Sequence, residues 1–284
     1  MTTGPDDALT AIDTWGADHA AAAFVGPHGV VARHGDGGHI FRWASITKLV
    51  TALAVLSAVD DRLVDLDEPA GPPGSTVRHL LAHASGLSFE GSMSIAAPGT
   101  RRIYSNAGFD MLGELLAERE NRAFIEVLRA RVLDPLDMRT TTLDGRPSQG
   151  LYGPLGDLER LAVELLRATL VRPETMSLAT TVAFAGLKGL LPGVGTFDPL
   201  DWGLGFELRD AKVPHWTGRS NSSGTFGHFG GSGTFLWVDP AIDRALLCLT
   251  DREYGPWALG AWPDFSDAVM SSSPRSGRPR VGFR

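Results

Sequence analysis

Several residue types and signals are scarce in this 284-residue chain. A single cysteine, Cys248, excludes a disulfide framework within the chain, and its apolar neighbours predict a place in the core. No apolar run reaches the roughly 18 residues that a membrane-spanning helix requires. The first residues carry neither a basic region nor an apolar segment, so we expect no secretory signal, no membrane partner and a cytoplasmic protein.

Positive charge is also limited. The chain has 33 acidic and 26 basic residues and a formal net charge of −7, so we expect no nucleic-acid partner. Only three of the basic residues are lysines, at positions 48, 188 and 212. Neither a Gly-x-x-x-x-Gly-Lys loop nor a Gly-x-Ser-x-Gly elbow occurs, so nucleotide binding and an α/β-hydrolase fold have no support.

The order of predicted elements indicates an α+β fold. We expect an antiparallel sheet domain from residues 1–60 and 200–284, with a helical lobe, 61–199, inserted between them. The tail 271–280 is of low complexity and is predicted to be disordered. Periodicity predicts helices over 6–20, 45–59, 77–83, 107–119, 123–133, 157–170, 174–190 and 257–271, and strands over 21–25, 30–33 (joined by a four-residue loop), 202–208, 233–238 and 244–250.

Ser45 and Lys48 precede a long apolar segment. Residues 49–59 are aliphatic or alanine on nearly all sides, which predicts a buried helix that starts near Ser45. The two side chains would then lie about one turn apart on one face. Burial would lower the pKa of Lys48 enough for it to accept the Ser45 proton, and the helix N-terminus would face an oxyanion. Alternatively, Ser45 only caps the helix and Lys48 is solvated, because Ser-x-x-Lys alone is a weak motif.

Two further motifs follow in order. Tyr104 and Asn106 form a Tyr-x-Asn element, and residues 227–231 read Gly-His-Phe-Gly-Gly. With the Ser-x-x-Lys pair, they resemble the motifs of the serine β-lactamase and penicillin-recognising enzyme family, in its branch of class C β-lactamases, D-alanyl-D-alanine carboxypeptidases, D-aminopeptidases and esterases. Segments 79–87 and 134–138 resemble framework segments of that family. The resemblance runs from about residue 20 to 250 and implies a β-lactamase/transpeptidase-like fold, an antiparallel sheet flanked by helices.

The resemblance also implies roles for individual residues. Ser45 would attack an ester or amide carbonyl and form an acyl-enzyme, while Lys48 and Tyr104 would share the proton transfers. Backbone N–H groups of Ser45 and Gly231 would form the oxyanion hole. The implied substrate-binding and oxyanion positions are Asn106, which would hold Lys48 or a substrate amide, together with His228, Gly230 and Gly231.

The chain departs from the family's Lys-Thr-Gly motif at His228 and Phe229. A lysine there would pair with a β-lactam carboxylate, whereas a histidine carries that charge only partly near pH 7. Phe229 also lacks a hydroxyl for the same carboxylate. We therefore expect a carboxylesterase-like or small-amide hydrolase with a small-molecule substrate. A β-lactamase, a D-alanyl-D-alanine carboxypeptidase or D-aminopeptidase, and a non-catalytic binding scaffold of the same fold are the alternatives.

No metal and no cofactor are expected. His79 and His83 have the spacing of a zinc-binding helix, but Leu80 stands where the His-Glu-x-x-His motif has its glutamate. We therefore expect both histidines to be structural.

Overall fold

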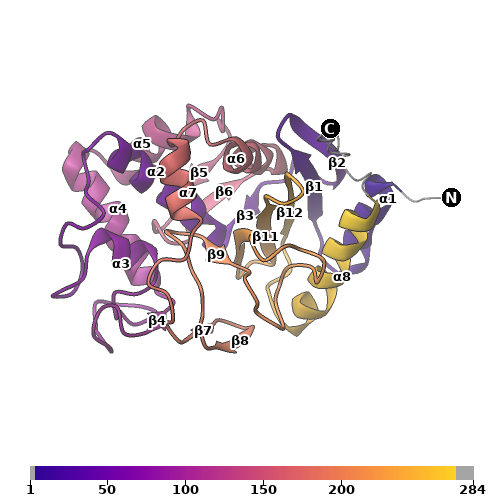
Figure 1. Ribbon diagram of the computed structural model, residues 1–284. Helices are drawn as coiled ribbons and strands as arrows, with labels where there is room; N and C mark the ends of the chain where they lie inside the picture. The colour runs from indigo at the N-terminus through magenta and orange to yellow at the C-terminus, as the bar shows by residue number, and fades with distance from the viewer. Residues whose placement is uncertain (1–3, 273–284) are drawn as a thin grey trace, which may run out of the picture.

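A six-stranded antiparallel sheet stands at the centre of the computed structural model, which describes residues 4–272 (Figure 1). The strand order is β2-β1-β12-β11-β10-β9, so β1 and β12 join the two ends of the chain as predicted. Most of the predicted disordered tail lies outside the described residues. The strands are β1 Ala20–Gly26, β2 Gly29–Gly35, β9 Glu207–Leu208, β10 Phe226–Gly230, β11 Thr234–Asp239 and β12 Arg244–Thr250.

Both faces of the sheet are covered. Along β1, Ala21, Ala23 and Val25 belong to one buried cluster, while Ala22 and Phe24 belong to another. This alternation follows from the two-residue period of a strand. The first cluster contains residues of the central helices and the second contains residues of the two terminal helices, so the sheet lies between two helical layers (Figure 1). The α+β prediction is confirmed.

The helices form largely where apolar periodicity predicts them. The long α2 is buried on nearly all sides, as expected for a helix that is apolar all round. The helices are α1 Pro5–Leu9, α2 Thr47–Asp60, α3 Val77–Leu81, α4 Asn106–Glu120, α5 Phe124–Leu128 with a π-helical continuation Arg129–Leu133, α6 Leu155–Arg167, α7 Pro173–Ala179 and α8 Pro256–Ser272.

Two predictions at the N-terminus need correction. The helix predicted over 6–20 is shorter, because α1 passes into a 3-10 turn, Thr10–Thr14, and the chain reverses at Gly16 with φ of 66°. The β1–β2 hairpin has a two-residue loop instead of four, since Gly26 pairs with Gly29.

The region from 174 to 208 differs most from the prediction. α7 ends at Ala179, and residues 180–188 form turns and irregular chain. They lead into β7 Gly189–Leu191, which pairs with β8 Gly195–Phe197 and with β4 Arg102–Ile103. The predicted strand 202–208 is reduced to β9 and an isolated bridge at Trp202. A left-handed φ of 94° at Gly205 interrupts that strand. A pattern of apolar residues does not show where a glycine adopts a left-handed backbone conformation and ends a strand.

The division into a sheet domain and a helical lobe, 61–199, stays a prediction. α6 lies inside that segment and yet packs against β1 and β12. A second small sheet, β3-β6-β5, pairs β3 Phe41–Arg42, just before Ser45, with β6 Leu151–Gly153, and β6 with β5 Thr142–Leu143. Among residues 4–272, no helix combines the length and apolar character needed to cross a membrane.

Gly230 lets the sheet approach the turn that carries Ser45. A Cβ at Gly230 would lie 2.5 Å from the Trp43 carbonyl oxygen and 3.1 Å from Ala44 Cβ. The first distance is shorter than real Cβ contacts and the second is tighter than most of them, so the end of β10 packs this closely against the Ser45 turn because residue 230 has no side chain. A Cβ at the neighbouring Gly231 would meet no atom within 4 Å.

We predict that Gly230→Ala lowers the free energy of unfolding by about 1–3 kcal/mol, because the added methyl group forces the strand away from the turn. Gly231→Ala is the matched control and should change it by less than about 0.5 kcal/mol. Urea denaturation of both variants measures the difference. Equal stabilities would show that the close approach at Gly230 does not constrain the fold.

Candidate active site

Ser45 lies on a tight turn between β3 and α2. The turn is 3-10 helical, Ala44–Ile46, and Ala44 adopts a left-handed φ of 47° that is uncommon for a residue with a side chain. The Ser45 side chain makes no capping hydrogen bond to the helix, whose N-cap residue is Ile46. The interpretation of Ser45 as only a helix cap is therefore wrong.

Lys48 is buried, with no solvent-exposed surface, so its interpretation as a solvated side chain is also wrong. Its Nζ lies 3.3 Å from Ser45 Oγ, 2.6 Å from Asn106 Oδ1 and 2.9 Å from the Ser148 carbonyl oxygen. These three partners come from three separate segments of the chain. The predicted contact between Lys48 and the serine hydroxyl is present in the structure.

Burial lowers the pKa of Lys48 to about 7, because an ammonium ion loses its hydration there. The carboxylates of Asp110 and Glu90 oppose this effect, and the Arg146 guanidinium adds to it. Near neutral pH a large fraction of Lys48 is therefore a free amine that can accept a proton.

Tyr104 completes the group around Ser45. Burial raises the pKa of the Tyr104 phenol well above its ordinary value, and a hydrogen bond with Ser45 opposes that rise only in part. The phenol therefore keeps its proton at neutral pH. The Lys48 Nζ atom lies 4.8 Å from the centre of the Tyr104 ring. His83, which is buried, packs its ring 4.5 Å from that of Tyr104.

His228 is neutral, which differs from the partial charge expected from the sequence. Burial lowers the pKa of His228 to about 3, and the nearby Lys48 charge acts in the same direction. Its Nδ1 lies 2.6 Å from the Phe229 carbonyl oxygen, which can only accept, so Nδ1 carries the proton. Nε2 then has a free lone pair and lies 3.4 Å from the Tyr104 hydroxyl.

A small cavity of about 200 Å³ opens at Ser45. Four of the residues that line it were predicted from the sequence, namely Ser45, Tyr104, His228 and Gly231. The remaining walls were missed, because they belong to loops and strand ends without a recognisable motif. These walls are Phe89, Leu191, Pro192, Gly193 and Tyr254, whereas Phe229, the last lining residue, lies in the motif 227–231.

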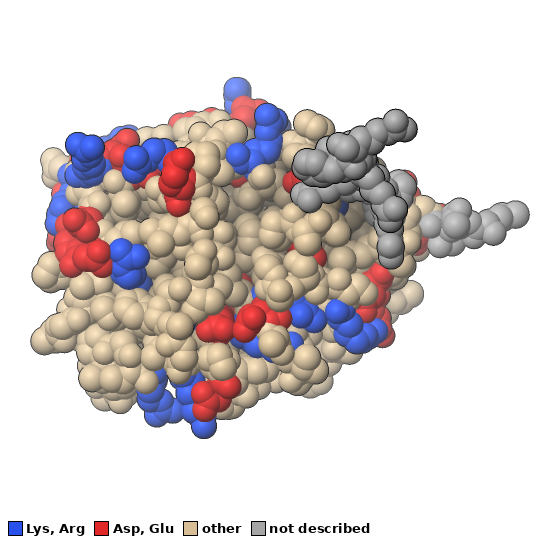
Figure 2. Space-filling model, viewed as in Figure 1, with Lys and Arg blue, Asp and Glu red and all other residues tan. Residues whose placement is uncertain are grey.

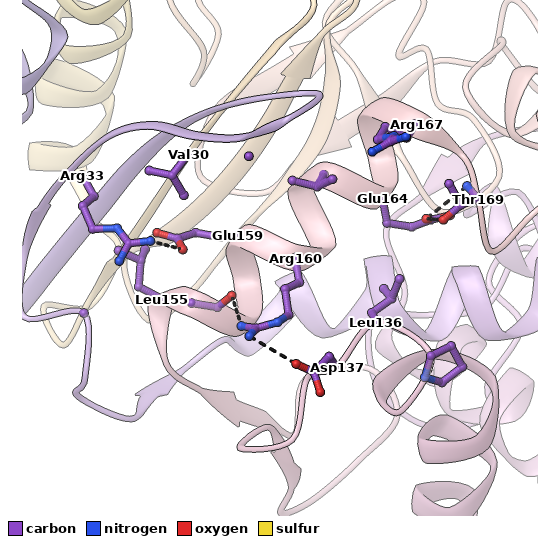
Figure 3. Close-up of a pocket in the computed structure, with 15 residues that line it drawn as sticks. Val30, Arg33, Leu136, Asp137, Leu155, Glu159, Arg160, Glu164, Arg167 and Thr169 are labelled. Atoms are coloured by element: carbon purple, nitrogen blue, oxygen red, sulfur yellow. Dashed lines mark hydrogen bonds and ion pairs between the residues drawn. The ribbon is translucent and has the colours of Figure 1, made fainter.

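The chain has a larger cavity of about 680 Å³ between β2 and α6, away from Ser45 (Figure 3). Its charged side chains largely pair with one another. Arg33 bonds Glu159 at 2.7 Å, and Arg160 lies 3.4 Å from Asp137. Ser45, Tyr104 and His228 line the smaller cavity, and the buried Lys48 amine contacts Ser45, so we place the candidate active site there.

One group in the described part of the chain has the donors for a metal ion. The ligand atoms of His19, Asp36 and His39 lie within 4.8 Å of one another. The two histidine rings are stacked at 3.9 Å, and His19 Nδ1 bonds Asp251 at 2.8 Å. None of these residues lines the Ser45 cavity.

The fold and the site define a β-lactamase-like serine hydrolase class, and comparison with known proteins supports it. A family model described as Beta-lactamase matches residues 16–266. The chain therefore belongs to the Beta-lactamase family. Mb2281c from Mycobacterium bovis, whose structure is described as that of a beta-lactamase, is 51% identical, with a TM-score of 0.91 over 93% of this chain and 98% of that chain.

More distant relatives carry different names. Esterase EstB of Burkholderia gladioli is 25% identical over 76% of this chain and 78% of EstB. D-alanyl-D-alanine-carboxypeptidase/endopeptidase AmpH of Escherichia coli is 26% identical over 39% of this chain. That match spans only 38% of AmpH. Because an esterase and a peptidase both occur among the relatives, family membership alone assigns no substrate.

We predict that the His228 ring does not titrate between pH 5 and 8, because burial holds its pKa at about 3. The ring nitrogen shifts in ¹H–¹⁵N NMR spectra should stay constant over this range, with the signals assigned by their loss in His228→Gln. A titration midpoint between about 6 and 7, the usual range of a solvated histidine, would contradict the neutral site.

Proposed function

We propose that the protein is a serine hydrolase that forms an acyl-enzyme on Ser45 and acts on small, uncharged carboxylic esters or amides. The observation that carries this proposal is the contact between the buried amine of Lys48 and the Ser45 hydroxyl at 3.3 Å. A serine needs a neighbouring base to become a nucleophile near neutral pH.

In the acylation step, Ser45 Oγ attacks the carbonyl carbon while its proton passes to Lys48 Nζ. The oxyanion that forms would accept hydrogen bonds from the backbone N–H groups of Ser45 and Gly231, each such donor typically contributing about 10²–10³-fold. The bond to the leaving group then breaks, and its oxygen or nitrogen takes a proton through the Tyr104 hydroxyl. Tyr104 regains that proton from Lys48. A water molecule releases the acyl group by the same transfers in reverse.

The neutral site favours uncharged substrates. His228 presents a lone pair at Nε2, which would repel the carboxylate that a β-lactam carries. The walls formed by Phe89, Leu191 and Pro192 are apolar. Removing a charged group from water is costly unless a partner compensates it. These features support an ester or small amide with a short acyl or leaving group.

β-Lactam hydrolysis is the second candidate. Mb2281c is described as a beta-lactamase and shares 51% identity with this chain. The acylation chemistry at Ser45 is common to both candidates, and the difference lies in whether the site accepts a substrate carboxylate.

We predict turnover of p-nitrophenyl butyrate that disappears in Ser45→Ala, with much slower cleavage of nitrocefin. Parallel absorbance assays of wild type and variant measure both substrates. Fast nitrocefin cleavage would make β-lactams the preferred substrates despite the neutral His228. Ester turnover at equal rates in both proteins would remove Ser45 from the mechanism.

The ester reaction should also depend on pH through Lys48. Below about 7, the pKa of Lys48, protonation of the amine removes the base, so kcat/KM should fall roughly tenfold per pH unit. Above that pH the rate should level off. Lys48→Ala and Tyr104→Phe should each lower the plateau by at least about 10². Circular dichroism spectra like that of wild type would show that both variants fold. A near wild-type rate in either variant would contradict the role given to the substituted residue.

A further inference from the structure

Six hydrogen bonds form a closed ring that begins and ends at the Lys48 amine. We propose that Glu90 and Asp110 are positioning residues for acyl transfer, which hold the Asn106 amide and the Ser148 carbonyl so that the lone pair of neutral Lys48 faces Ser45. The inference rests on the proposed function and goes beyond it, because neither carboxylate lines the substrate cavity.

One half of the ring runs through Asn106. Lys48 Nζ donates to Asn106 Oδ1 at 2.6 Å, and Asn106 Nδ2 donates to Glu90 Oε1 at 2.7 Å. The other carboxylate oxygen of Glu90 accepts from Arg146 Nη2 at 2.6 Å. Asn106 begins α4, whereas Glu90 and Arg146 lie outside the helices.

The other half returns through the segment that precedes β6. Arg146 Nε donates to Asp110 Oδ2 at 2.8 Å, and the second oxygen of Asp110 accepts from the Ser148 backbone N–H at 3.1 Å. The Ser148 carbonyl then accepts from Lys48 Nζ at 2.9 Å. Asp110 lies one turn after Asn106 on α4, so one helix face supplies both halves of the ring.

Glu90 decides which way the Asn106 amide faces. A carboxylate only accepts hydrogen bonds, so the amide must turn its NH₂ group toward Glu90 and its oxygen toward Lys48. A reversed amide would instead direct N–H donors at the amine. The carboxylate thereby keeps an acceptor beside Lys48 in every turnover.

Two carbonyl acceptors fix the orientation of the lone pair. A neutral amine has two N–H donors and one lone pair. Asn106 Oδ1 and the Ser148 carbonyl oxygen can only accept, so they take both donors. The third direction, toward Ser45 Oγ, is left to the lone pair that receives the serine proton.

The ring also contributes the charged side chains that act on the pKa of Lys48. Partial burial opposes ionisation of Glu90, but its bonds from Asn106 and Arg146 hold its pKa below the ordinary value, so it is a carboxylate at neutral pH. Burial likewise keeps His83 and His228 neutral by lowering their pKa values. The groups that face Lys48 are thus Glu90, Asp110 and Arg146, which are charged, and Tyr104, His83 and His228, which are neutral.

A purely structural role would be weak for Glu90. Its side chain and that of Arg146 are each 44% exposed, and exposed ion pairs of this kind contribute about 0–1 kcal/mol to stability. Glu90 variants should therefore fold. A change in the titration midpoint of Lys48 in such variants would therefore come from the ring of hydrogen bonds and not from unfolding.

The scarcity of lysine makes Lys48 directly observable. With ¹³C-labelled lysine the protein gives signals from three lysines only, and the Lys48 signal is identified by its absence in Lys48→Arg. We expect its titration midpoint to move to lower pH by about one unit in Glu90→Gln and in Asp110→Asn, since a carboxylate that favours the ammonium form is lost. Glu118→Gln, which removes an exposed carboxylate from the same helix, is the control and should leave the midpoint unchanged.

Kinetics separate the two effects of Glu90. Glutamine removes the charge and can still turn its one amide oxygen toward Asn106 Nδ2, so Glu90→Gln should shift the acid limb of kcat/KM and lower the plateau kcat less than Glu90→Ala does. Glu90→Ala removes the acceptor as well and should lower kcat about tenfold or more with little change in KM, because the amine is misplaced.

Unchanged Lys48 midpoints in Glu90→Gln and Asp110→Asn, or an unchanged kcat in Glu90→Ala, would overturn the proposal. A wild-type protein that turns over no ester, amide or β-lactam would overturn the proposed function instead. The NMR titration does not need turnover, so it still tests the ring in that case.

Discussion

The burial of the Lys48 amine is the constraint on which the rest of the site depends. Removing an ammonium ion from water costs several kcal/mol even after the protein relaxes, and a buried charge without partners is not tolerated. In this structure two carbonyl oxygens accept hydrogen bonds from the amine, and two nearby carboxylates favour its charged form. The result is an amine balanced between its two protonation states near neutral pH, which is the condition that a recyclable base requires.

The sheet holds the other side of the same site. His228 lies on β10, which is hydrogen-bonded to β11, and helices cover both faces of the sheet. The end of β10 approaches the Ser45 turn more closely than a side chain at residue 230 would permit, because that residue is glycine. Acidic and basic side chains are interspersed on the face shown in Figure 2, so the surface in view offers no broad field of one sign to draw in a charged ligand.

The sequence predicted the parts of this molecule that repeat a local pattern. The apolar helix after Ser45 and the terminal strands have clear periods, and the motif residues were placed by their resemblance to a family. Glu90, Arg146 and Tyr254 gave no such signal, because their roles come from contacts between segments far apart in the chain. The helix predicted over 174–190 was wrong beyond Ala179 for a related reason, since β7 is formed by pairing with the distant β4.

A histidine at position 228, where the family's Lys-Thr-Gly motif has a lysine, affects more than the charge of that one position. A lysine at this place would lie in the same buried pocket as Lys48, and each cation would lower the pKa of the other. A neutral histidine with its proton fixed on Nδ1 avoids that competition and leaves Lys48 as the one group beside Ser45 that titrates near neutral pH in the described structure. It also places an acceptor, Nε2, 3.4 Å from the Tyr104 hydroxyl. The histidine at position 228 thus has two consequences. This position offers no cation for a substrate carboxylate, and it adds no second cation beside Lys48. If the proposed function holds, such a site would bind its substrates through shape and apolar contact, and Lys48 would carry the one charge beside Ser45 that changes near neutral pH.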